Sequence, residues 1–171
     1  MASASFRVGR VYPRLIMGGA EAGILQLLET IPDTHMVVTM VEGARAVRAR
    51  ELAAGYTLCE RPRFQGLFEA LRGCEIVHIH TINNHLLIPL AAQLAGPRAL
   101  IQTVHNRLEA EYCHFVDHTI VLNEETIPLL DTPGETTVVP NGIPVMDSLP
   151  EYRPWHEEGR PLRLVEIRRE D

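Results

Sequence analysis

Short apolar runs alternate along the chain with longer segments in which apolar residues recur at helical spacing. Residues 35–41 (HMVVTMV) are almost continuously apolar, which is typical of a strand covered on both faces. Ala20, Ile24, Leu27, Leu28 and Ile31 instead recur at the spacing of one helix face. On this basis we expect seven strands, at residues 5–12, 35–41, 56–59, 75–80, 99–104, 118–122 and 136–139.

The segments between these strands predict helices, at residues 20–31, 43–54, 64–72, 86–95, 107–115 and 124–130. Gly55, Gly73 and Gly96 follow three of them, where the C-cap of a helix favours glycine. Strands that alternate with such helices indicate βαβ units and a parallel sheet. The predicted fold class is therefore α/β: a Rossmann-like, doubly wound, mainly parallel sheet of about seven strands with helices on both faces.

The chain changes character after residue 143. Residues 144–161 contain several prolines and acidic residues without periodicity, which indicates a linker. Residues 162–167 (LRLVEI) then begin a new strand pattern. We therefore predict a Rossmann-like N-terminal domain at residues 1–143, a linker at 144–161 and, at 162–171, the first strand of a second domain, which makes the chain the first part of something longer.

Composition narrows the chemistry. The 171 residues are 46% hydrophobic and carry a net charge of −6, and all sixteen basic residues are arginine. Without lysine the chain can be neither a P-loop phosphate binder nor a Schiff-base enzyme. Its acidity, without a basic stripe, argues against nucleic acid as a partner. The three cysteines lack metal-like spacing, and the chain shows neither an apolar leader nor an apolar run long enough to span a membrane. We therefore expect reduced thiols in a cytoplasmic protein.

The predicted carboxyl ends of the strands carry the candidate chemistry, because ligands of open α/β sheets bind there. Gly18 and Gly19 follow the first strand and lead into a helix. Two glycines let the backbone approach a ligand closely, and a helix N-terminus favours anionic groups. The alternative is an ordinary tight turn between strand and helix.

Histidines and asparagines follow the fourth predicted strand. Alternation places His78 and His80 on one face of the sheet. Two histidines on one face suggest a metal site, but no carboxylate or cysteine follows at ligand spacing. We favour a polar patch for substrate hydroxyls made by His80, Asn83 and Asn84, with His78 as a core histidine.

The last three predicted strands also end in polar residues. His105 and Asn106 follow the fifth strand, where a histidine can donate to a sugar hydroxyl or a phosphate or act as an acid or base. The alternative is that this pair caps a helix. Asn123, after the sixth strand, suits a helix N-cap, and Asn141 with Gly142, after the seventh, suits a turn.

Five of these segments, in their order and spacing, resemble the N-terminal domain of family 4 retaining glycosyltransferases, which have the GT-B fold. They are residues 18–21 (GGAE), 75–80 (EIVHIH), 103–106 (TVHN), 116–124 (VDHTIVLNE) and 138–143 (VVPNGI). Each segment alone is a weak signal, but together they extend the resemblance over nearly the whole chain.

The resemblance implies an enzyme that needs no metal and no cofactor, and that moves a sugar from a nucleotide-diphosphate sugar to the hydroxyl of a carbohydrate or lipid-linked acceptor. A second domain would hold the donor. It implies these roles: Gly18, Gly19, Glu21 and Arg168 beside the donor diphosphate or sugar, His105 as the catalytic residue, His80, Asn83, Asn84 and Asn106 toward the acceptor, and Asn141 and Gly142 at the hinge.

Departures from the family leave alternatives open. Ile167 stands where the family has a glycine before the arginine, and the late glutamate pair of the second domain is not identified, so we expect this chain alone to be inactive. One alternative is a non-catalytic or split-enzyme module that needs a partner chain. Another is an NAD-binding oxidoreductase domain, for which residues 18–23 (GGAEAG) are a near-match.

Peripheral contact with the inner face of a membrane is a further alternative, because relatives use lipid-linked acceptors. Arg45, Arg48 and Arg50 lie on one predicted helix and would meet anionic lipid. A solvated helix face explains the same arginines equally simply, and we prefer it.

Overall fold

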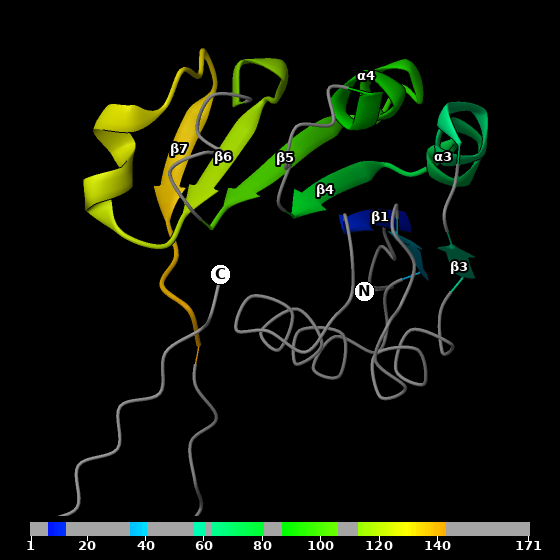
Figure 1. Cartoon of the computed structure of the whole chain (residues 1–171), viewed down its shortest axis with the longest axis horizontal. Helices are drawn as coiled ribbons and strands as arrows, with labels where there is room; N and C mark the ends of the chain where they lie inside the picture. Colours follow the sequence, from blue (N-terminus) through cyan, green and yellow to red (C-terminus); the bar gives the residue numbers. More distant parts are fainter. Residues whose placement is uncertain are drawn as a thin grey trace, which may run out of the picture.

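The computed structural model describes residues 7–12, 35–40, 57–60, 63–80, 87–105 and 113–142. These residues form one seven-stranded sheet in the order β3-β2-β1-β4-β5-β6-β7, and every neighbouring pair is parallel (Figure 1). The strands are β1 (Arg7–Tyr12), β2 (His35–Met40), β3 (Thr57–Glu60), β4 (Ile76–His80), β5 (Ala99–Val104), β6 (His118–Val121) and β7 (Glu135–Val138).

The strand order is that of a doubly wound sheet. It runs outward from β1 in one direction through β2 and β3, and from β4 in the other direction through β5 to β7. The order therefore reverses between β1 and β4, as it does in the Rossmann fold. This confirms the predicted α/β, Rossmann-like class with a parallel sheet of seven strands.

Two helices lie together on one face of the sheet, α3 (Phe64–Leu71) and α4 (Leu87–Leu94) (Figure 1). Their buried side chains form an apolar core with alternate residues of the strands, among them Val77 and Ile79 of β4. Because successive strand residues point to opposite faces, His78 and His80 point away from these helices. The helices expected at 20–31 and 43–54, which the prediction needs for the second face, lie outside the described residues.

Close packing requires glycine at one position in β1. A Cβ atom on Gly9 would lie 2.7 Å from Leu71 Cδ2 and 3.0 Å from Cys74 Sγ, well inside van der Waals contact. The bare backbone of β1 therefore lets α3 and the segment after it approach the sheet.

The glycines after α3 and α4 end these helices as predicted. Gly73 has φ +79° and Gly96 has φ +69°, the left-handed backbone conformation that residues other than glycine rarely adopt. Gly55, the third predicted cap, lies outside the described residues.

The helix predicted at 124–130 is a 3₁₀ helix, η2 (Glu124–Leu129). Asn123 caps it as expected, because its Oδ1 accepts from Thr126 N at 3.1 Å. Pro128 lies inside the element and has no N–H to donate, which disfavours an α-helix there. The Leu130 N–H instead closes a tighter turn on Ile127 O.

A second, smaller apolar cluster consists of Val104, Cys113 and Val121, with Leu130 and Val138 packed against it. Cys74 and Cys113 are buried, and burial raises the pKa of the Cys74 thiol. No helix within the described ranges is long and apolar enough to cross a membrane.

Candidate functional site

Polar side chains gather near the carboxyl ends of β1, β4 and β5, on the sheet face opposite α3 and α4. We call them the Arg–His cluster: Arg10, Tyr12, His78, His80, Thr103 and His105. The strand register brings them together, since Arg10 pairs with His78 across β1 and β4, and His80 pairs with Thr103 across β4 and β5. The cluster therefore spans the point where the strand order reverses.

Arg10 is the centre of the cluster. Its Nη1 donates to His78 Nδ1 at 3.1 Å and to His80 Nε2 at 3.3 Å. Only 7% of Arg10 is exposed, and no carboxylate in the described ranges pairs with it. The guanidinium charge is therefore buried between two imidazoles and is not neutralised by an acidic side chain of these ranges.

Thr103 extends the cluster to β5. The second ring nitrogen of His78, Nε2, lies 2.7 Å from Thr103 Oγ1. An arginine can only donate, so His78 Nδ1 accepts from Arg10 and the proton of a neutral ring lies on Nε2, which donates to Thr103. Both ring nitrogens of His78 thus have hydrogen-bond partners within the protein, as expected for a structural histidine, and its side chain is half-buried.

The two histidines are neutral near pH 7. Burial, the Arg10 charge and His105 lower the pKa of His78 from 6.5 to about 3. Burial above all, and then His78, Arg10 and His105, hold the pKa of His80 well below its ordinary value. Of Arg10, His78 and His80, only Arg10 is therefore charged, while the two imidazoles serve as hydrogen-bonding groups.

Aromatic rings line the edge of the sheet around His80. The Tyr12 ring stacks on it with a centroid distance of 4.8 Å, and the His78 ring lies at 3.9 Å. His105 follows the last residue of β5, and its ring centroid is 6.1 Å from that of His80. Two residues singled out in separate sequence motifs, His80 and His105, are therefore neighbours.

The other predicted site residues do not join this cluster within the described residues. Asn141 and Gly142 follow β7, are exposed, and belong to a strand two positions from β5, roughly 10 Å away at the usual strand spacing. Seven predicted residues lie outside the described ranges: Gly18, Gly19, Glu21, Asn83, Asn84, Asn106 and Arg168.

Sequence reasoning missed Arg10 and Tyr12. The available signal was the strand pattern RVGRVY, in which Arg10 and Tyr12 share a face and end a strand that must be buried. An arginine at such a position needs acceptors, and His78 and His80, on one face of another strand, were the candidates.

Neither the cluster nor any other part of the described ranges offers three or more histidine, cysteine, aspartate or glutamate side chains that could hold a metal ion. In the cluster, His78 Nδ1 and His80 Nε2 already accept from Arg10. A metal ion would have to displace this cation from both lone pairs, so the pair is poorly suited to metal binding.

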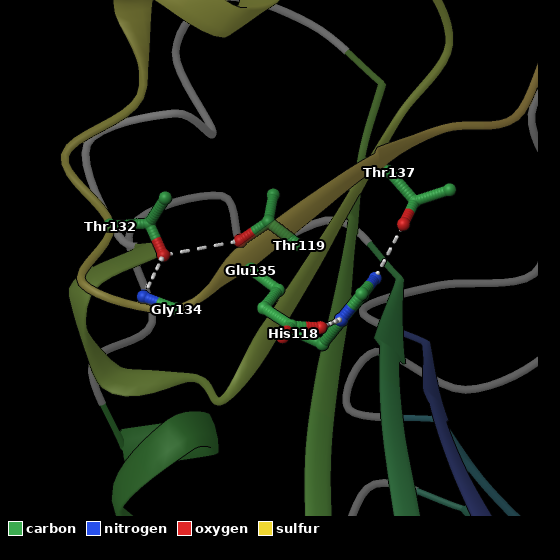
Figure 2. A network of polar contacts seen from close by, with 6 residues as sticks. All are labelled: His118, Thr119, Thr132, Gly134, Glu135 and Thr137. Atoms are coloured by element: carbon green, nitrogen blue, oxygen red, sulfur yellow. Dashed lines mark hydrogen bonds and ion pairs between the residues drawn. The ribbon is translucent and has the colours of Figure 1, made fainter.

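A second polar network lies at the amino ends of β6 and β7 (Figure 2). His118 Nε2 lies 2.9 Å from Thr137 Oγ1, and His118 Nδ1 lies 3.7 Å from Glu135 Oε2. The Glu135 side chain is 89% exposed, so solvent screens its contact with His118. We interpret the network as a link between two strands, at the end of the sheet opposite to the Arg–His cluster.

Comparisons with known proteins add little to this description. No family model and no curated protein matches the chain. Among solved structures, the chain is similar to NmrA, a negative transcriptional regulator crystallised in complex with NAD, with 15% identity and a TM-score of 0.47. The match covers 62% of this chain and 35% of that one. At this level the likeness carries no argument about function, and the Rossmann-like fold assigned above rests on the strand order.

Proposed function

We propose that the chain is the N-terminal, acceptor-side part of a retaining glycosyltransferase of GT-B fold. The reaction would move a sugar from a nucleotide-diphosphate sugar to an acceptor hydroxyl. The observation that carries the proposal is the proximity of His105 and His80, at 6.1 Å between ring centroids, at the carboxyl edge of the sheet. Both histidines belong to the motifs in which the sequence resembles family 4 glycosyltransferases.

The position of these rings suits sugar recognition. In open α/β sheets the ligand lies beyond the carboxyl ends of the strands, near the reversal of strand order. His80 is the last residue of β4, which borders this reversal, and His105 follows β5. The His80 ring keeps one hydrogen-bonding group, Nδ1, that can donate to a hydroxyl group of a sugar.

The charge of Arg10 also supports the proposal. A buried cation without a carboxylate partner in the described ranges gives this edge of the sheet a positive potential. Glycosyl transfer from a nucleotide-diphosphate sugar develops negative charge on the departing diphosphate, and fixed positive groups stabilise such charge.

The proposal assigns the donor to a second domain, or to a partner chain in a split enzyme. Residues 162–167 and Arg168, where that domain is expected to begin, lie outside the described residues. Positioning the donor against the acceptor supplies much of the rate enhancement, so this chain by itself should give little transfer.

The test uses the complete reading frame of the source gene, assayed with a panel of nucleotide-diphosphate sugars and carbohydrate or lipid-linked acceptors. His105→Ala should lower kcat by about 100-fold or more, as expected for a side chain at the reaction centre. His118→Ala is the matched control, since His118 lies on the same sheet at its opposite end, and its kcat should stay near the parent value.

Two results would contradict the proposal. One is an unchanged kcat in His105→Ala, which would leave this histidine a helix-capping role. The other is saturable binding of NAD by the chain, measured by calorimetry, with no response to nucleotide sugars from the complete protein, which would favour the dinucleotide-binding alternative.

A further inference from the structure

The contacts of Arg10 determine where the protons of two histidines lie. A guanidinium has donors and no acceptor, so each nitrogen that it contacts must present a lone pair. Arg10 Nη1 contacts His78 Nδ1 and His80 Nε2, which are different atoms of the two rings. Arg10 therefore selects opposite tautomers in His78 and His80.

His78 carries its proton on Nε2, and this proton is used within the protein. Nε2 lies 2.7 Å from Thr103 Oγ1, which accepts it. Arg10 and Thr103 thus use both ring nitrogens of His78, so His78 has no hydrogen-bonding group left for a ligand.

His80 differs from His78 in this respect. Its Nε2 accepts from Arg10, so its proton lies on Nδ1. His80 is 4% exposed, and Nδ1 has no hydrogen-bond partner among the described residues. A buried donor without a partner costs free energy, so its retention at the last residue of β4 points to an acceptor atom supplied by something that binds there.

We propose that Arg10 is a positioning residue that fixes His80 as the Nδ1–H tautomer, so that His80 donates a hydrogen bond to an oxygen of the acceptor substrate. The tautomer follows from the contacts alone, whereas the identity of the oxygen rests on the proposed function. An acidic side chain in place of Arg10 would impose the reverse arrangement, because a carboxylate accepts and would hold the proton on His80 Nε2.

The first experiment reads the tautomers directly. Long-range ¹H–¹⁵N spectra of the histidine rings, recorded on the ¹⁵N-labelled chain near neutral pH, distinguish a nitrogen with a lone pair from one with a proton. We expect the lone pair on Nδ1 of His78 and on Nε2 of His80, with neither ring protonated twice. A His80 ring with its proton on Nε2, or an imidazolium at either position, would overturn the proposal without any variant.

Variants then test whether Arg10 is the cause. Arg10→Met removes the donor, and the His80 ring should lose its exclusive Nδ1–H form. Arg10→Lys keeps a single cationic nitrogen that can donate to both rings and should restore it. Arg7→Met is the matched control, because Arg7 is an exposed arginine of the same strand, and should leave both tautomers unchanged. If Arg10→Met does not fold, the comparison of Arg10→Lys with the parent chain still decides: a changed tautomer in a folded Arg10→Lys protein contradicts the proposal.

A kinetic experiment on the complete enzyme tests whether His80 donates to the acceptor substrate. Losing one oriented hydrogen bond to the acceptor should raise the acceptor KM of Arg10→Met about tenfold, with a smaller change in kcat and in the donor KM. Arg10→Lys should recover much of the acceptor KM. Altered tautomers with an unchanged acceptor KM would reject the substrate contact. Absence of any transfer by the parent enzyme would instead contradict the proposed function and leave the tautomer result standing.

Discussion

The Nε2 atom of His78 lies 2.7 Å from Thr103 Oγ1, across the interface between β4 and β5. The same pair of atoms recurs at the surface, where His118 Nε2 lies 2.9 Å from Thr137 Oγ1 across β6 and β7. Thr103 is 6% exposed, whereas Thr137 is exposed, so one chemical contact is present in two environments.

Replacing each threonine with valine should separate these environments. Thr103→Val leaves the buried N–H of His78 without an acceptor and should lower the free energy of unfolding by about 1–3 kcal/mol. Thr137→Val leaves His118 free to contact water and should change it by less than about 0.5 kcal/mol. Urea denaturation measures both. Equal losses would mean that burial does not determine the strength of this contact.

The pKa of His78 predicts that the protein loses stability in mild acid. This pKa is about 3 in the folded chain against 6.5 ordinarily, so the unfolded chain binds more protons between these values. The stabilising contribution of the neutral His78 should therefore be fully present above about pH 6.5. As the pH drops toward 3, the free energy of unfolding should fall by up to about 1.4 kcal/mol per pH unit for such a histidine. His80, whose pKa is lowered in the same direction, should add to the loss.

Urea midpoints between about pH 7.5 and pH 5, above the range of most carboxylates, measure this effect. His78→Gln is the informative variant, since an amide can accept from Arg10 and donate to Thr103 but does not titrate. Its stability should depend less steeply on pH than that of the parent chain. A parent stability that is flat over this interval would contradict the buried neutral histidines.

Gly134 should be intolerant of any side chain. An added Cβ would lie 2.3 Å from Asp117 O and 3.0 Å from Val116 O, both backbone atoms that cannot move aside easily. Gly134→Ala should cost about 3 kcal/mol of unfolding free energy. Gly142→Ala is the control, because nothing lies within 4 Å of its added Cβ, and should be near neutral. A small effect at Gly134 would show that the turn before β7 relaxes readily.

Gly9 is crowded by side chains, which gives a different expectation. Gly9→Ala should cost about 1–3 kcal/mol, because the new methyl group meets Leu71 Cδ2 at 2.7 Å. In a Leu71→Ala background this contact is absent, so the same substitution should cost less. A double-mutant cycle by urea denaturation gives the coupling. Additive effects would mean that another neighbour of Gly9 limits the packing.

Local pattern was sufficient to predict most of the sheet. The strand predicted at 99–104 coincides with β5 (Ala99–Val104), and the one predicted at 75–80 begins one residue before β4 (Ile76–His80). A parallel strand buried on both faces has a dense apolar pattern that is visible within a few residues. The sequence also contained a signal for the 3₁₀ helix η2, because Pro128 lies inside it, but the prediction of a helix at 124–130 did not use this proline.

The Arg–His cluster could be predicted only in part. His80 and His105 were visible because each follows an apolar strand, at the edge where ligands bind. The contacts of Arg10 depend on the register between β1 and β4, which brings residues 68 positions apart into hydrogen-bonding distance. No local pattern contains that register, so neither the tautomers nor the lowered pKa values of the histidines could be inferred from the sequence.

The strand order also determines how the sheet must assemble. Every neighbouring pair of described strands is consecutive in the chain except β1 and β4, whose contact closes a loop of 68 residues. Closing this loop carries the largest entropic cost of any strand pairing in the sheet. We therefore expect β1–β3 to pair with one another, and β4–β7 likewise, before β1 pairs with β4. Arg10, His78 and His80 lie at the interface between β1 and β4. Their hydrogen bonds can form only when these two strands pair in the native register. We therefore expect the cluster to form in the last step of folding, at the same edge of the sheet where a ligand would bind.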